Sequence, residues 1–116
     1  MKKVYLDNAA TTQLNQKVVD EMTSVLVNSY GNPSSTHSFG RDSKTIIELS
    51  RKFIANMFNV KPKEIFFTSG GTESNNMIIK SCIEHGVERI ITTKIEHKAV
   101  LNPVLNLSHD KKVDLE

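Results

Sequence analysis

The octapeptide at residues 69–76 combines residue types that can hold a phosphate group. It reads Ser-Gly-Gly-Thr-Glu-Ser-Asn-Asn and follows a strand-like apolar run at 65–68. The first turn of a helix leaves backbone N–H groups without partners and carries the positive end of the helix dipole. Gly70 and Gly71 lack a Cβ, so the backbone can turn sharply and an anion can approach it closely. Thr72 adds a hydroxyl, and the pattern predicts either a phosphate site or an ordinary strand-to-helix turn with a threonine cap.

His97 is the second candidate for chemistry. It follows the β-branched run at 89–93, which predicts another strand. An imidazole is flat enough to stack on a ring, and its pKa near neutrality allows it to move a proton. Ligands of parallel α/β sheets bind beyond the carboxyl ends of the strands, where both the turn at 69–72 and His97 are expected. We therefore expect the two loops to face one concave site, although a lone histidine is more often an ordinary surface or core residue.

Helical periodicity governs the first half of the chain. Apolar residues recur at helical spacing over 13–29 and again over 41–59, so each stretch predicts a helix with one buried face. The intervening stretch is rich in Gly, Asn, Pro and Ser and predicts a loop. Pro62 disfavours helix at the residue before it and ends the second helix.

The second half alternates strands and helices. The expected order is strand 65–68, helix 72–85, strand 89–93, helix 97–107 and the start of a third strand at 113–115. Pro103 would lie inside the last helix and kink it. Such alternation predicts a parallel α/β sheet with right-handed crossovers. Parallel sheets are covered on both faces and have more strands than this, so we expect open edges and uncovered apolar faces at Ile65, Phe67, Ile90 and Ile91.

Composition excludes several classes of function. The 116 residues carry a formal charge of +2 with 24% charged residues spread along the chain, so no one-sided basic stripe predicts nucleic-acid binding. Cys82 is alone and is expected inside the helix at 72–85; together with His85 it does not make a zinc site. The sequence shows no signal peptide, no membrane span and no P-loop motif, and we expect a cytoplasmic protein.

Several separated stretches agree on one family. They are YLDNAATT at 5–12, GNPSSTHSFG at 31–40, FFTSGGTESNN at 66–76 and EHKAVL at 96–101. In these motifs and their order the chain resembles the N-terminal part of the cysteine desulfurases, within the class V aminotransferase group of pyridoxal-phosphate enzymes. The resemblance implies N-terminal helices followed by the first strands and helices of a mostly parallel, doubly wound sheet, an incomplete fold type I large domain. Residues 1–60 would be a loop and helical segment, and residues 61–116 the start of the cofactor-binding α/β domain.

The resemblance also implies roles for single residues. Gly71 and Thr72 would bind the 5′-phosphate of pyridoxal 5′-phosphate, and His97 would lie over the pyridine ring and take part in acid–base steps. The resemblance implies that the loop containing His37 approaches the active site, as the corresponding loop does in the family. The simpler alternative is that His37 is an ordinary loop residue. The stretch at 8–11 resembles one that lines the substrate side of the site, and a capped strand-to-helix loop remains open as the alternative.

The full-length enzyme would convert L-cysteine to L-alanine and an enzyme persulfide. It would act as a homodimer and pass sulfur to an acceptor or iron–sulfur scaffold protein. The alternatives are another class V enzyme, namely a selenocysteine lyase or an aminotransferase, and a non-catalytic truncated or split-gene fragment. The family's Schiff-base lysine and catalytic cysteine belong to later motifs, and Cys82 is not that cysteine. We therefore expect the 116-residue chain alone to be inactive.

Overall fold

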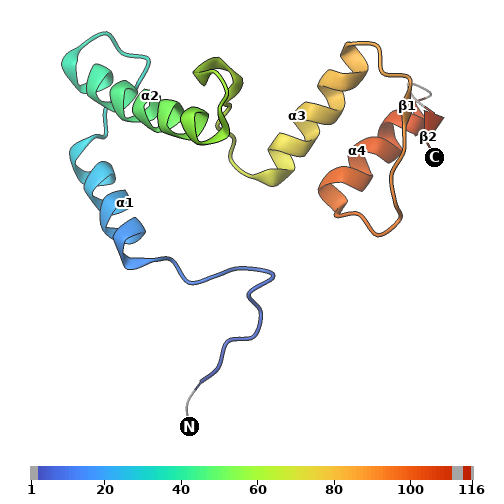
Figure 1. Cartoon of the computed structure of the whole chain (residues 1–116), viewed down its shortest axis with the longest axis horizontal. Coiled ribbons are helices and arrows are strands. Elements are labelled where there is room, and N and C mark those ends of the chain that lie inside the picture. Colours follow the sequence, from blue (N-terminus) through green and yellow to red (C-terminus); the bar gives the residue numbers. More distant parts are fainter. Residues whose placement is uncertain (1–2, 111–113, 116) are drawn as a thin grey trace. The chain divides into compact units, whose positions relative to one another are not determined.

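The computed structural model describes residues 3–110 and 114–115. In chain order the elements are α1 (Gln16–Asn28), α2 (Ser38–Phe58), the 3-10 turn η1 (Pro62–Glu64), α3 (Gly71–Glu84), β1 (Arg89–Ile90), α4 (Lys98–His109) and β2 (Asp114–Leu115) (Figure 1). The chain divides into two units, Met1–Ile65 and Phe66–Glu116.

Capping side chains set the starts of both helices in the first unit. The Asn15 side chain accepts a hydrogen bond from the backbone N–H of Lys17 at 3.0 Å, so α1 begins after Asn15 and not at the predicted residue 13. His37 caps α2 in the same way, and this helix begins at Ser38 instead of residue 41. Asn59 ends α2 in the left-handed region with φ 54°. Both predicted helices are confirmed, with their N-terminal bounds moved by the caps.

Close backbone contacts shape the loop between α1 and α2. A Cβ added at Gly31 would lie 2.2 Å from the carbonyl oxygen of Phe39, and one added at Gly40 would lie 2.5 Å from that of Ser35. Glycine is therefore required at both positions, because no other residue fits this approach. The hydroxyl of the buried Ser43 donates to the carbonyl of Ser29 at 2.8 Å, which joins α2 to the end of α1.

In the second unit, two helices pack beside a short parallel sheet. α3 and α4 lie side by side, and β2 contacts α4 (Figure 1). β1 pairs with β2 in parallel, with Arg89 opposite Asp114 and Ile90 opposite Leu115. Ala99, Pro103 and Val104 of α4 are buried. The predicted helices and the parallel pairing are confirmed, and Pro103 does lie inside α4; of the predicted third strand, residue 113 lies outside the described residues.

Most of the residues predicted to lie in strands do not lie in strands. Residues 65–68 form no strand, and of the run at 89–93 only Arg89 and Ile90 are in one. A strand exists through ladder hydrogen bonds to a neighbouring strand. The described residues contain only two strands of two residues each, so they offer no neighbouring strand along which the apolar runs could extend.

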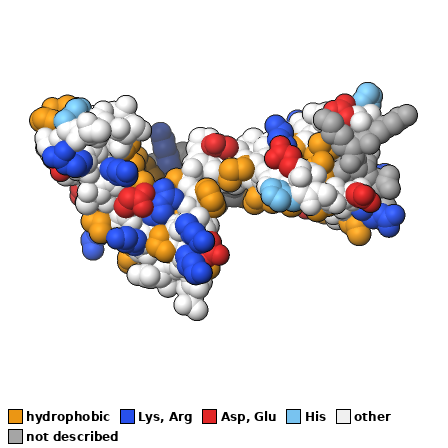
Figure 2. Space-filling view, turned by 90° about the horizontal axis from the view of Figure 1, so that it is seen from above, with side chains coloured by type: hydrophobic (Ala, Val, Ile, Leu, Met, Phe, Trp, Pro, Cys, Tyr) orange, Lys and Arg blue, Asp and Glu red, His pale blue; other side chains and the backbone are white. Residues whose placement is uncertain are grey.

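Large apolar side chains remain exposed in both units. The predicted buried face of α1 is not buried, since Val18, Met22 and Leu26 are 45%, 52% and 72% exposed. Of the faces predicted to be uncovered, Ile91 is 76% exposed and Phe67 49%, whereas Ile65 and Ile90 are partly buried. Figure 2 shows hydrophobic side chains on the visible surface between charged ones. The helical amphipathicity is real, but the described residues do not supply the layer that would cover it.

Among the described residues, no helix has both the length and the apolar character needed to cross a membrane.

Candidate phosphate-binding site

The candidate site begins with the backbone at the start of α3. Gly71 is the first helical residue and Gly70 is the N-cap, with no side chain capping the helix. Thr72 lies inside the first turn, so the alternative in which it caps the helix is wrong; its carbonyl instead accepts from Asn76 Nδ2 at 2.9 Å. The first N–H groups of α3 therefore face outward without intrahelical acceptors, as at any helix start.

The two glycines leave room above these N–H groups. Gly70 has φ 163° and ψ 179°, which is extended backbone that any residue adopts, and Gly71 is helical. Glycine is therefore not needed for a sharp turn here, contrary to the expectation from sequence. A Cβ added at either position would meet no atom within 4 Å. What the glycines provide is open space through which an anion can reach the backbone.

Two side-chain ties hold the preceding loop against the first turn of α3. Glu73 Oε2 accepts from the Ser69 backbone N–H at 2.6 Å and from its hydroxyl at 2.7 Å. The hydroxyls of Thr68 and Ser74 lie 2.7 Å apart, and Thr68 also donates to the carbonyl of Gly70 at 3.2 Å. The hydrogen bonds from the Ser69 hydroxyl and then its N–H lower the pKa of Glu73 below its ordinary value of 4.5. Its carboxylate is therefore charged at neutral pH.

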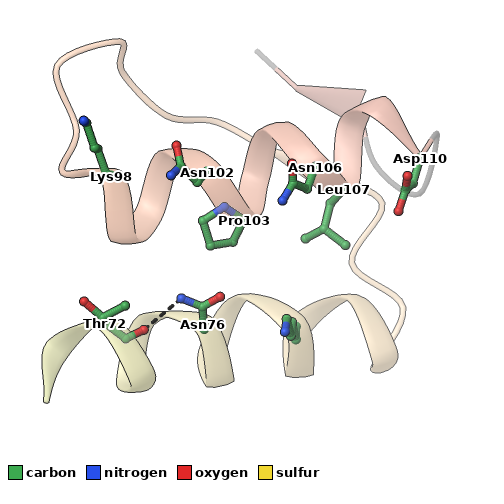
Figure 3. Close-up of a pocket in the computed structure, with 9 residues that line it drawn as sticks. Thr72, Asn76, Lys98, Asn102, Pro103, Asn106, Leu107 and Asp110 are labelled. Atoms are coloured by element: carbon green, nitrogen blue, oxygen red, sulfur yellow. Dashed lines mark hydrogen bonds between the residues drawn. The ribbon is translucent and has the colours of Figure 1, made fainter. Parts of the chain in front are cut away.

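A groove of about 370 Å³, lined mostly by polar residues, runs between α3 and α4. It is lined by Thr72, Asn76, Lys80, Lys98, Asn102, Pro103, Asn106, Leu107 and Asp110 (Figure 3). Thr72 and Lys98 lie at the same end of the two neighbouring helices (Figure 3). Lys98 and the start of α3 thus lie at the same end of the groove, with the Lys98 side chain pointing away from α3 (Figure 3), and both bring positive charge that favours an anion.

His97 lies directly before α4. It is the N-cap of that helix, and its Nδ1 accepts from the backbone N–H of Ala99 at 3.1 Å. In the neutral ring this hydrogen bond puts the proton on Nε2. The side chain is exposed. Gly71 and His97 do not line the groove themselves, so the common concave site of Gly71, Thr72 and His97 stays a prediction.

Sequence reasoning missed two charged residues at this end of the unit. Glu73 lies four residues after Ser69, and Lys98 follows the histidine of the EHKAVL motif. Acidic residues in a first helical turn are a common capping signal that could have drawn attention to Glu73. Lys98 could be found only once α3 and α4 were known to be neighbours.

The remaining candidates lie elsewhere. His37 and the stretch at 8–11 belong to the first unit, where His37 caps α2 and Asn8 and Thr11 help line a hollow of about 630 Å³. Cys82 was expected to be packed inside, but it is exposed on α3, because no described element covers that face of the helix. The described residues contain no cluster of His, Cys, Asp or Glu that could hold a metal ion.

A parallel α/β unit with a glycine-rich helix start is an arrangement typical of enzymes that hold a phosphorylated cofactor. The profile of the family "Aminotransferase class-V" matches residues 4–116, and the chain belongs to this family.

Cysteine desulfurases are among the relatives that the chain resembles. It is 50% identical over 105 residues to the cysteine desulfurase IscS of Dictyoglomus turgidum, covering 88% of this chain and 27% of that protein. It is 46% identical over 104 residues to the mitochondrial cysteine desulfurase of Saccharomyces cerevisiae, covering 86% of this chain and 21% of that protein.

Solved structures give the same result. A NifS-like protein superposes with a TM-score of 0.89 at 41% identity, covering 99% of this chain and 32% of that one. The chain thus spans about a fifth to a third of the length of these proteins and matches their N-terminal part. The resemblance read from the motifs and the expected fold type I class are confirmed.

Proposed function

We propose that this chain provides the phosphate-binding segment of a pyridoxal-phosphate-dependent cysteine desulfurase. The observation that carries the proposal is the start of α3, where the space above Gly70 and Gly71 is open and no side chain caps the helix. The similarity to desulfurases supports the same conclusion. Identity is 50% to the desulfurase of Dictyoglomus turgidum and 34% to the selenocysteine lyase of Bos taurus, so a desulfurase is preferred to a lyase.

The residues present fit pyridoxal 5′-phosphate. Its dianionic phosphate would take the open position at Gly71, with the Thr72 hydroxyl donating a hydrogen bond and the Lys98 ammonium adding positive charge at the groove end. When bound, the cofactor supplies the electron sink that allows bonds of the amino-acid substrate to break. The chain's own contribution is to bind and orient the phosphate end.

His97 is the proposed proton-transfer group and cofactor neighbour. In the neutral ring the lone pair that can take a proton is on Nδ1, which accepts from the N–H of Ala99, so proton uptake by His97 in this proposal breaks that hydrogen bond. The same hydrogen bond fixes the ring against the start of α4.

In this proposal, the longer protein carries out the complete reaction. L-Cysteine is the substrate, and the sulfur passes to an acceptor such as an iron–sulfur scaffold protein. A homodimer in the cytoplasm is the proposed working form. The 116-residue chain alone is proposed to be inactive, since no lysine within it lies in the context that the family uses to bind the cofactor covalently.

A chimera tests the function directly. This chain replaces the matching N-terminal segment of the Dictyoglomus turgidum desulfurase, to which it is 50% identical. The chimera should bind pyridoxal 5′-phosphate and release alanine from L-cysteine. A folded chimera that binds the cofactor and acts on selenocysteine but not on cysteine would show that the lyase assignment is the right one. A folded chimera that does not bind the cofactor would contradict the phosphate-binding role.

A further inference from the structure

We propose that Glu73 is a positioning residue of the phosphate site, because its carboxylate holds Ser69 and so fixes the backbone on which the phosphate binds. The inference rests on the proposed function and assigns a role to a residue beyond Gly71, Thr72 and His97. Glu73 itself is not proposed to touch the phosphate.

The two hydrogen bonds from Ser69 to Glu73, here named the Glu73 tie, have a specific geometry. One oxygen, Oε2, accepts both the N–H and the hydroxyl of Ser69 at 2.6 and 2.7 Å. Ser69 precedes the N-cap Gly70, which has no side chain and no neighbour within 4 Å of the place where a Cβ would stand. The glycines alone would leave this turn free to move. Gly70 has no side chain that could restrain the turn, and Glu73, in the first turn of the helix, supplies that restraint instead.

The tie also leaves the binding groups available. Glu73 occupies the N–H of Ser69, and Ser74 N–H donates to the carbonyl of Gly70 at 3.1 Å. The amides of Gly71 and Thr72 lie between these two bonds. An N-cap serine or aspartate would normally accept from the amide of the second or third helical residue, here Thr72 or Glu73. A restraint placed on Ser69 instead of a cap at position 70 keeps the turn rigid and its anion-binding groups free.

A carboxylate near a phosphate has a cost, since like charges repel. Glu73 is exposed, so water and salt screen that repulsion strongly. Lys98, which lines the same end of the groove as Thr72, brings charge of the opposite sign. The charge and the hydrogen-bond acceptor of Glu73 therefore have opposite effects on an anion, and a substitution can separate them.

Three substitutions separate positioning from charge. Glu73→Ala removes the acceptor and the charge, Glu73→Gln keeps an acceptor oxygen without the charge, and Ser69→Ala removes one of the two donors. Glu84→Ala is the matched control, because Glu84 is an exposed glutamate at the other end of the same helix. Far-UV circular dichroism reports whether each variant keeps its helices.

The measurement is a titration of the ¹⁵N-labelled 116-residue chain with inorganic phosphate, followed at the amides of Gly71 and Thr72. Hydrogen exchange of the Ser69 amide reports the tie itself. We expect Glu73→Ala to speed that exchange and weaken phosphate binding about tenfold, a loss that matches one hydrogen bond to a charged group. Glu73→Gln should bind phosphate as tightly as the original chain or more tightly, Ser69→Ala should lie between, and Glu84→Ala should change nothing.

The outcomes are distinguishable. If phosphate shifts the two amides in the original chain and equally in Glu73→Ala, the positioning role is overturned and the phosphate site stands. If Glu73→Gln is as weak as Glu73→Ala with its helices intact, charge and not the hydrogen bonds is responsible, and the inference is again overturned. If phosphate leaves the original chain's amides unshifted, the phosphate site itself is wrong. Should Glu73→Ala lose its helices, Ser69→Ala and Glu73→Gln decide the question.

Discussion

Gly71 illustrates how one residue can serve binding at the expense of stability. It is the first residue of α3 and is surrounded by open space, so alanine would fit there without a clash. Replacing a glycine by alanine where the backbone permits it stabilises a protein by about 0.4–1 kcal/mol. The added methyl group would stand where an anion must approach. Stability and binding are therefore expected to move in opposite directions.

The substitution Gly71→Ala should raise the unfolding midpoint and weaken phosphate binding in the same chain. Thermal unfolding and a phosphate titration measure the two effects. Gly86→Ala is the control, since Gly86 has φ 89° and alanine there should destabilise without affecting phosphate. Unchanged phosphate affinity in Gly71→Ala would mean that the open space is not used by a ligand.

The Thr72 hydroxyl is expected to contribute one charge-assisted hydrogen bond to the cofactor phosphate. Thr72→Ala in the chimera should weaken pyridoxal 5′-phosphate binding by about 1.5–3 kcal/mol, which is roughly ten- to a hundred-fold. Thr72→Ser retains the hydroxyl and should bind nearly as well. Equal affinities for the alanine and threonine forms, measured by titration, would count against the contact.

Glu73 should give the loop before α3 a characteristic pH dependence. Its pKa is lowered in the folded chain, first by the Ser69 hydroxyl and then by the Ser69 N–H. A lowered folded pKa means that its stabilising contribution is complete above the ordinary value of 4.5 and is lost as the pH falls through the lower folded value. The Ser69 amide shift should follow this titration and stay flat in Glu73→Gln. A flat profile in the original chain would refute the tie.

At the scale of the element, α4 depends on the same histidine that is proposed to move protons. His97 Nδ1 caps the helix through Ala99. His97→Ala should destabilise α4 by about 1 kcal/mol, as loss of a cap does, whereas His97→Asn should restore the stability because asparagine is a good N-cap. Chemical denaturation measures both variants.

Activity in the chimera separates the two roles of His97. His97→Asn should remain stable yet lose desulfurase activity, since an amide cannot exchange protons as imidazole does. Full activity in a stable His97→Asn chimera would show that His97 is a structural cap alone.

The elements also show what sequence could and could not predict. Helical periodicity predicted α1 and α2, because amphipathic spacing is a local property of the sequence, and the alternation of strands and helices predicted α3 and α4. The predicted first residue of α2 is three residues too late, because histidine is an unusual N-cap and His37 was not expected to cap the helix. The strands at 65–68 and 89–93 were overestimated, since a strand needs a partner that local sequence does not reveal. The Glu73 tie and the groove position of Lys98 depend on where α3 starts and on what lies beside it.

At the scale of the whole molecule, apolar surface decides how the chain should behave. Phe66, Ile78 and Ile95 are 69%, 58% and 94% exposed in the second unit, and Leu26 and Phe58 are 72% and 70% exposed in the first. Among the hydrophobic side chains of the described residues, only Ala55, Ala99, Pro103 and Val104 are buried. Surfaces of this kind associate in water, because burying apolar area is favourable. Both units are therefore expected to gain stability from any polypeptide that covers these faces.

We expect the purified 116-residue chain to self-associate and to release no sulfide from L-cysteine, even with pyridoxal 5′-phosphate added. Light scattering and a sulfide assay at the same protein concentrations test both points. The chimera with the Dictyoglomus turgidum desulfurase is the control: in it the matching later segment should cover the apolar faces, so it should scatter less and be active. A chain that stays monomeric at high concentration would contradict the association argument, and sulfide release by the chain alone would show that the residues named here suffice for the chemistry.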